Sequence, residues 1–362
     1  MYILNFTLKQ HTPIIHFQHD QDGATLRATE VKPKLDRFIL MNIGKNDYEA
    51  GRIYAKSNDW LIDKEKGALN YKLIIESQSS NIEVKIEKAY PNYLGNMGKT
   101  LDEKAFIFSD KVNVKFICSN NDLKKKINDE FSNFLTSTNF GTRKSKGFGC
   151  YSLLDNTERN FDTQMLRIFG TVFKLTWKNS TVNIFDDHKF LFRRIQDEYK
   201  VLKAGDSRSK KDSKLRQYVN NLDIPIEWEK PVIQTDIATI SKKNLNIEWK
   251  NKNFHFVRAF LGLADHFEYK NENVVVNIKP KDENLQRFMS PILFKIFNNQ
   301  LYIVSNPDSD LSLLRGQIIN INYSKDAKLV ETVSNRLTIP DIDFNVSDFL
   351  TQALNNTQWR QL

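Results

Sequence analysis

The chain has 362 residues, 40% of them hydrophobic and 27% charged, and its 53 Lys and Arg against 44 Asp and Glu give a formal net charge of +9. These values are typical of a soluble protein long enough to bury two cores, and no apolar run approaches the length of a membrane span, which excludes a membrane-embedded chain. The basic excess favours a polyanionic partner.

The N-terminus alternates polar and apolar residues and lacks the basic and apolar regions of a signal peptide, so we expect the protein in the cytoplasm. Cys118 and Cys150 lie on separate predicted strands without a partner motif, which predicts two buried thiols and neither a disulfide nor a metal pair. We predict no metal and no cofactor.

The first strand is predicted at Tyr2 to Leu8, where side chains of one parity are apolar. The polar stretch from His11 to Gly23 follows, with titratable residues at His11, His16, His19, Asp20 and Asp22. A metal site or a general acid–base pair is one interpretation. The spacing matches no helical HxxxH arrangement, which favours a solvated or RNA-facing loop.

A helix is predicted from Thr29, its N-cap, with Pro33 in the first turn and Val31, Leu35, Phe38 and Ile39 on the buried stripe. Helix N-termini attract anions, so Arg27, Lys32 and Lys34 form a candidate phosphate site, with Arg37 further out. The alternative is a surface helix with solubilising charges.

The next predicted elements are a hairpin of Tyr71–Glu76 and Ile82–Glu87, a strand at Val112–Cys118, a helix at Asp122–Leu135 and a strand at Phe148–Leu154. With the first strand and helix, this order indicates a ferredoxin-like, split βαβ fold.

A glycine-rich stretch, NFGTRKSKGFGCY, runs from Asn139 to Tyr151 between that helix and the last strand. Glycine permits positive φ or a close approach to a ligand, and Arg, Lys, Ser and Thr donate to phosphate oxygens. A P-loop or a dinucleotide fingerprint would need a strand before the glycines and a helix after them, the reverse of the order found here. A polyanion-binding loop and a solvated αβ connection remain as the two interpretations.

Gly141 to Gly149 resembles the glycine-rich loop of the RAMP superfamily, the RNA-binding subunits of CRISPR effectors, whose pattern is Gly-x-Arg-x-Ser-Arg/Lys-Gly-Phe/Tyr-Gly. Leu26 to Arg37 resembles the first helix of that superfamily, with Pro33 where Gly is usual and Arg37 one residue late. Because the loop is in mid-chain, the sequence is most similar to the family of first subunits of the Cmr series in type III-B complexes, which have two ferredoxin-like halves.

The resemblance implies that the chain binds CRISPR guide RNA and target RNA and assembles with other Cmr-type subunits in a hetero-oligomeric filament. The implied RNA-binding residues are Arg27, Lys32, Lys34, Arg37, Gly141, Thr142, Arg143, Lys144, Ser145, Lys146, Gly147, Phe148 and Gly149. Further candidates are His16, His19, Arg208, Lys210, Lys211 and Lys214.

In the second half we predict a strand at Thr171–Trp177, a helix at Phe190–Leu202, a strand at Asn273–Ile278, a hairpin of Ile292–Phe297 and Gln300–Ser305, and a helix at Asp348–Asn356. Residues 203–216 are rich in Lys and Arg and are predicted to be an insertion that either meets RNA backbone or is a disordered surface segment. The predicted fold is α+β with tandem ferredoxin-like (RRM-like) domains at 1–158 and 159–362.

The predicted function is a non-catalytic RNA-binding subunit of a type III CRISPR effector that holds the 3′ region of the guide. One alternative is a metal-dependent RNase that uses Asp20 or Asp22 in the loop after the first strand. The other is a free-standing RNA-binding protein, which would purify as a soluble monomer.

Overall fold

The computed structural model describes residues 1–15, 26–63, 67–77, 82–85, 105–109, 111–177, 184–205, 212–222, 226–243, 254–269, 271–282, 285 and 288–362. The fold is mixed α+β with mainly antiparallel sheets. The chain divides into two compact units. The first contains residues 1–195, 294–303 and 360–362, and the second contains residues 196–293 and 304–359. Among the described residues, no helix has both the length and the apolar character to cross a membrane.

The first sheet has the strand order β2-β5-β1-β6, with every neighbouring pair antiparallel. Its strands are β1 (Tyr2–Gln10), β2 (Tyr71–Ser77), β5 (Val112–Cys118) and β6 (Tyr151–Leu153). The predicted β1 and β5 are confirmed. The strand predicted from Phe148 is shorter, because residues 147–150 belong to the loop before β6.

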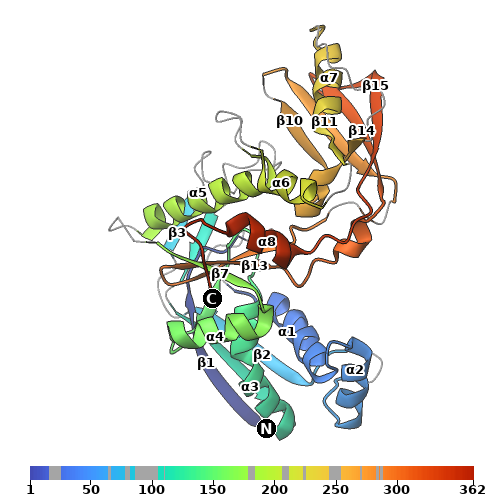
Figure 1. Cartoon of the computed structure of the whole chain (residues 1–362). Coiled ribbons are helices and arrows are strands. Elements are labelled where there is room, and N and C mark those ends of the chain that lie inside the picture. Colours follow the sequence, from blue (N-terminus) through green and yellow to red (C-terminus); the bar gives the residue numbers. More distant parts are fainter. Residues whose placement is uncertain are drawn as a thin grey trace. The chain divides into compact units, whose positions relative to one another are not determined.

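Helices α1 (Ala28–Ile43) and α3 (Asn121–Ser137) pack side by side against this sheet (Figure 1). The whole predicted stripe of α3 is buried, and so are Val31, Leu35 and Ile39 of α1. Asn120 caps α3 by accepting from two backbone N–H groups. The predicted Thr29 cap is wrong, since the N-cap is Arg27, two residues earlier, and Pro33 lies beyond the first turn.

Besides β2, three described elements lie between α1 and β5, namely α2 (Tyr48–Ser57), β3 (Ile82–Lys85) and β4 (Ala105–Phe108). The predicted hairpin of Tyr71–Glu76 with Ile82–Glu87 is wrong, because β2 pairs with β5, and β3 pairs with β4. Alternation identifies the buried face of a strand and carries no information on which strand lies beside it. Helix α2 was not predicted from the sequence.

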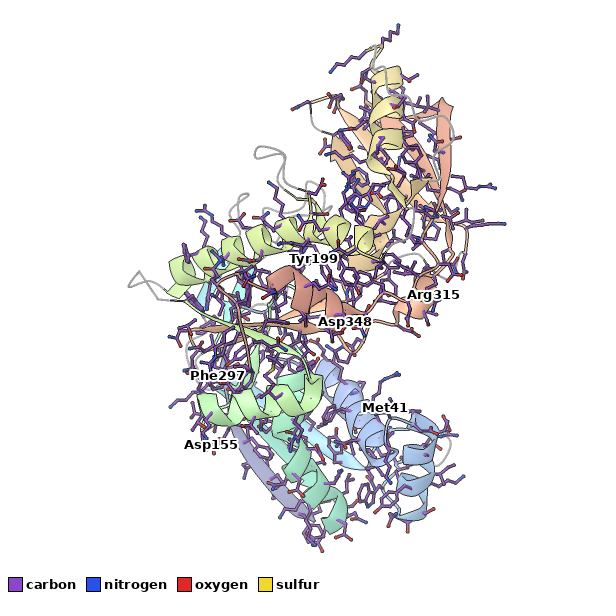
Figure 2. The ribbon with its side chains drawn as sticks, viewed as in Figure 1. Met41, Asp155, Tyr199, Phe297, Arg315 and Asp348 are labelled. Atoms are coloured by element: carbon purple, nitrogen blue, oxygen red, sulfur yellow. The ribbon has the colours of Figure 1, made fainter. Side chains whose placement is uncertain are left out.

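A second sheet of the first unit has the order β12-β13-β7-β16. Its strands are β7 (Val172–Thr176), β12 (Ile292–Phe297), β13 (Gln300–Ser305) and β16 (Arg360–Gln361). The hairpin of β12 and β13 is confirmed, and Asn298 in its turn has φ +51°. Helix α4 (Glu158–Phe169) packs nearby, where Phe161 stacks on Phe297 with ring centroids 4.4 Å apart (Figure 2 labels Phe297).

The second unit contains a six-stranded sheet with the order β10-β11-β14-β15-β9-β8. Its strands are β8 (Glu227–Trp228), β9 (Phe254–His255), β10 (His266–Tyr269), β11 (Val274–Pro280), β14 (Ile318–Lys325) and β15 (Lys328–Thr338). Its helices are α6 (Lys214–Asn220), α7 (Lys230–Ile240), α8 (Val346–Leu354), η2 (Val257–Leu261) and η3 (Leu311–Leu314), and α5 (Ile184–Lys203) continues into it. Of this sheet only β11 was predicted.

The two ends of the basic insertion at 203–216 lie in helices. Lys203 ends α5, and its ammonium donates to the Gly262 carbonyl at 2.6 Å, so it is a packing residue. Lys214 begins α6, with Ser213 as the N-cap. Arg208, Lys210 and Lys211 lie outside the described residues.

Candidate nucleic-acid interface

The glycine-rich loop connects α3 to β6 and is fixed to the body of the first unit along both of its sides. The Thr142 N–H donates to the Ile15 carbonyl at 2.8 Å, and the Gly149 N–H donates to the Pro13 carbonyl at 2.9 Å. On the other side the Phe294 N–H of β12 donates to the Ser145 carbonyl at 3.1 Å. The backbone of the loop is therefore held in place by hydrogen bonds to the rest of the first unit.

All three glycines of the motif have positive φ and pack closely inside the protein. A Cβ on Gly141 (φ +75°) would lie 2.6 Å from the Ile15 carbonyl oxygen. Gly149 has φ +64°, and a Cβ there would lie 2.0 Å from the Phe140 carbonyl oxygen. A Cβ on Gly147 would lie 2.5 Å from a methyl group of Ile296. Any larger residue at Gly149 would combine a strained backbone with a clash, so the motif is explained at these positions by packing.

Most of the backbone N–H groups of the motif already donate hydrogen bonds inside the protein. The Gly141 N–H donates to Glu30 Oε1 at 2.8 Å, and the N–H groups of Lys146 and Gly147 donate to carbonyls of the same loop. With Thr142 and Gly149, five N–H groups are therefore not available to a phosphate. A phosphate at this loop would therefore be met mainly by side chains.

The side chains of the motif divide into two groups. Phe148 is fully buried and stacks on Phe192 at 3.9 Å with an interplanar angle of 9°, so its assignment as an RNA-contacting residue is corrected to a core role. Arg143, Lys144 and Ser145 are only half-buried, and Arg143 has φ +54°, a left-handed conformation that is uncommon for a residue with a side chain. The exposed chemistry of the loop is cationic.

Buried hydrogen bonds of Asn139 and Thr12 also hold the loop in place. The Asn139 amide donates to the carbonyls of Lys144 and Phe294 at 2.7 and 2.9 Å and accepts from the Cys150 thiol at 3.1 Å. Thr12 Oγ1 donates to the Gly147 carbonyl at 2.7 Å. Sequence reasoning missed the roles of Asn139 and Thr12, because neither residue carries a charge or belongs to the glycine pattern.

The predicted thiols are confirmed, since Cys118 and Cys150 are both free and buried. Burial raises the pKa of each thiol. Cys150 was predicted on a strand, but it lies in the loop just before β6.

Lys295 of β12 is a fully buried cation that sequence reasoning also missed. Its amine donates to the carbonyls of Leu135 and Thr138 at the C-terminal end of α3, both at 2.6 Å. These carbonyls have no partner within the helix, and a cation there also complements the helix dipole. Burial lowers the pKa of Lys295 to about 8.

The N-terminal part of α1 is joined to the loop through one carboxylate. Glu30 Oε1 accepts from the Gly141 N–H at 2.8 Å and from the Lys34 ammonium at 2.5 Å. That ammonium lies 5.1 Å from the centre of the Phe140 ring. Lys34 and the loop are therefore neighbours, as the first-helix resemblance leads one to expect.

The other predicted cations of this helix differ in accessibility. The Lys32 ammonium is held by Asp36 at 3.0 Å and by the Leu69 carbonyl at 2.8 Å, so its charge is largely satisfied within the protein. Arg37 is exposed, and Arg27 at the N-cap is half-buried.

His11 is a core residue. Its Nδ1 accepts from the Asn298 backbone N–H at 3.1 Å, which places the ring proton on Nε2, 2.9 Å from Ser152 Oγ. Burial lowers the pKa of His11 well below its usual value, so a neutral ring is expected. His16, His19, Asp20 and Asp22 lie outside the described residues, and among those described no group of three or more His, Cys, Asp or Glu is placed to hold a metal.

Comparisons with known proteins cover the whole length of the chain. The family model described as the Cmr1 N-terminal domain matches residues 1–206, and the model of the Cmr1 C-terminal domain matches residues 210–361. No curated protein matches the sequence.

Two solved structures are similar to parts or all of the fold. The crystal structure of Cmr1 from Pyrococcus furiosus in its apo form covers 100% of this chain and 98% of its own, at 10% identity and a TM-score of 0.45. A chain of the type III-B Cmr-β complex bound to cognate target RNA covers 42% of this chain and 58% of its own, at 13% identity and a TM-score of 0.26. From the two family models, the chain belongs to the Cmr1 family, the first-subunit family of type III-B CRISPR effectors.

Proposed function

We propose that this Cmr1-family chain is a non-catalytic RNA-binding subunit that holds the 3′ region of the guide RNA and helps to capture target RNA. Its partners would be the other Cmr subunits of a hetero-oligomeric filament. The observation that carries the proposal is that Glu30 bonds both to the glycine-rich loop and to Lys34 of α1. The cations Arg143, Lys144 and Lys34 therefore lie on neighbouring segments of a chain with a net positive charge.

The proposed contacts are made by side chains to phosphates. Arg143 and Lys144 supply the loop's charges, and Lys34, whose side chain is 31% exposed, supplies one from the helix. Phosphate contacts of this kind fix the position of a strand and carry little sequence information. Sequence discrimination would then belong to base pairing between guide and target.

We further infer that the chain is built on two ferredoxin-like motifs. The order β6-β1-β5-β2 supports the first, since the fourth strand of the motif lies beside the first and the third beside the second. The order β16-β7-β13-β12 supports the second in the same way. The six-stranded sheet comes from segments inserted after α5 and after β13.

Neutralising the two loop cations tests the RNA-binding role. We expect Arg143→Gln with Lys144→Gln to weaken binding of single-stranded RNA. The negative slope of log affinity against log salt should become shallower by about 1.4, since each lost phosphate contact removes about 0.7. Fluorescence anisotropy over a salt series measures both quantities. The matched control is Lys125→Gln with Arg159→Gln, which removes the same charges from exposed positions on α3 and α4. Equal behaviour of the two double variants would refute the proposal.

The non-catalytic part of the proposal has a separate test. The purified chain should leave RNA intact in the presence of magnesium. Cleavage that Asp20→Ala abolishes would instead support the nuclease alternative.

A further inference from the structure

A pocket of about 580 Å³ lies beside the exposed face of α1 in the first unit. Its wall on the helix is formed by residues one turn apart, and the opposite wall comes from the start of α2, the turn before β2, and β2 itself. The lining residues are Ala28, Thr29, Lys32, Pro33, Asp36, Arg37, Tyr48, Gly67, Ala68 and Leu73. This volume is within the range of small-ligand sites, which are mainly apolar with a few polar groups.

The helix wall includes a residue whose carbonyl lacks its α-helical donor. Proline has no N–H, so Pro33 cannot donate the α-helical hydrogen bond to the carbonyl of Thr29. Both residues line the pocket, and Thr29 is exposed. An occupant with a hydrogen-bond donor would satisfy this carbonyl, whereas a purely apolar occupant would bury it without a partner.

The base of the pocket is a fixed ion pair. Lys32 and Asp36 are 3.0 Å apart, the Leu69 N–H donates to Asp36 Oδ2 at 3.2 Å, and the Lys32 ammonium lies 3.7 Å from the centre of the Tyr71 ring. Burial raises the pKa of Asp36. Because Lys32 and Asp36 are each held by several neighbours, their polar atoms have fixed positions at the pocket.

The rim combines a flat ring with an exposed cation. The Arg37 guanidinium lies 5.9 Å from the centre of the Tyr48 ring. Gly67 allows that tyrosine to come close, since a Cβ there would lie 2.1 Å from the Tyr48 hydroxyl. The flat ring of Tyr48 and the pyrrolidine ring of Pro33 give the pocket two apolar surfaces.

We infer that this pocket takes one unpaired base of a bound RNA strand, with the neighbouring phosphate at Arg37. A nucleobase matches the lining because it has apolar faces for Tyr48 and Pro33 and a polar edge for the Thr29 carbonyl and the Lys32–Asp36 pair. The inference rests on the proposed RNA-binding function and adds to it a site for a base, where the glycine-rich loop supplies phosphate contacts only.

The test uses the full-length chain and a short single-stranded RNA in which a single abasic ribonucleotide is moved from position to position. We expect one position to be sensitive, with a loss of affinity of about tenfold, the usual size for one stacked base. Ala68→Phe fills the pocket without changing any charge. In that variant intact RNA should bind about tenfold more weakly, and the abasic substitution should have no further effect.

Tyr48→Leu keeps the pocket apolar and removes the flat ring, and should give the same pattern if the Ala68 variant does not fold. If intact RNA binds while no position is sensitive, the pocket does not hold a base, and the inference is overturned although the RNA-binding function stands. An apolar side chain of a partner protein in the pocket would give this result. If the sensitive position persists in both variants, the base lies elsewhere and the inference is overturned. If intact RNA fails to bind at all, the proposed function itself fails.

Discussion

At the scale of single residues, Lys295 shows how a charge is accommodated in the core. A lysine on an otherwise apolar strand would be expected at the surface. Here its amine satisfies two carbonyls at the end of α3. A neutral amine keeps two N–H donors, so the hydrogen bonds survive deprotonation. The sequence could not reveal this, because the two carbonyls come from residues about 160 positions away in the chain.

The lowered pKa of Lys295 predicts a pH dependence of stability. Its folded-state pKa is about 8 against a usual 10.5, so between these values the unfolded chain binds more protons and stability rises with pH. The wild type should therefore gain stability relative to Lys295→Met between about pH 8 and 10.5, by up to roughly 3 kcal/mol. Urea unfolding across this range measures the difference. Lys125→Met, on the surface of α3, is the control and should give a flat difference.

At the scale of elements, periodicity located β1, β5 and α3, because each buries one face and its residues record which face. The β12–β13 hairpin, which is buried on both faces, was located instead by two apolar runs on either side of an Asn-Asn turn. Partnership between strands was not readable, which is why β2 was paired wrongly. In the candidate site, the pattern located the loop and its link to the first helix. It did not separate the packing residues Gly149 and Phe148 from the half-buried cations, since burial depends on Pro13, Phe192 and other distant residues.

Two glycine substitutions separate backbone strain from lack of space. Gly149→Ala meets positive φ and a carbonyl oxygen 2.0 Å from the new Cβ, so we expect a loss of about 3 kcal/mol or more in the free energy of unfolding. Gly170→Ala, at the end of α4, has φ +70° with nothing within 4 Å of the new Cβ, and should lose only about 1 kcal/mol. Chemical denaturation compares them. Similar losses at the two sites would show that the loop yields easily.

At the scale of the whole molecule, the compact units do not follow the chain. The first unit takes residues 294–303 and 360–362 from the far end of the sequence. The proposed domain boundary at 158/159 and the family-model boundary near 206–210 both divide the sequence once. A boundary placed by linear reading cannot describe a unit completed by returning strands.

This discontinuity predicts the behaviour of fragments. A fragment of residues 1–206 lacks β12, β13 and β16, so α3 loses Lys295 and Phe161 loses its stacking partner Phe297. We expect it to aggregate or to unfold without a cooperative transition. Co-expression with residues 207–362 should restore a soluble complex with a cooperative melt by circular dichroism. A fragment that melts cooperatively alone would contradict the role assigned to the returning strands.

The single oxygen of Glu30 that accepts from both Gly141 and Lys34 also bears on how the two walls of the interface behave when empty. Because loop and helix share this acceptor before any strand arrives, their separation is preset. If RNA binds here as proposed, association would cost little conformational entropy on the protein side, because the spacing of the two walls is already set in the unliganded form. Glu30→Gln, which weakens this clamp while removing a negative charge, should thus speed dissociation of RNA even though it makes the surface more basic, an effect that stopped-flow measurements would resolve.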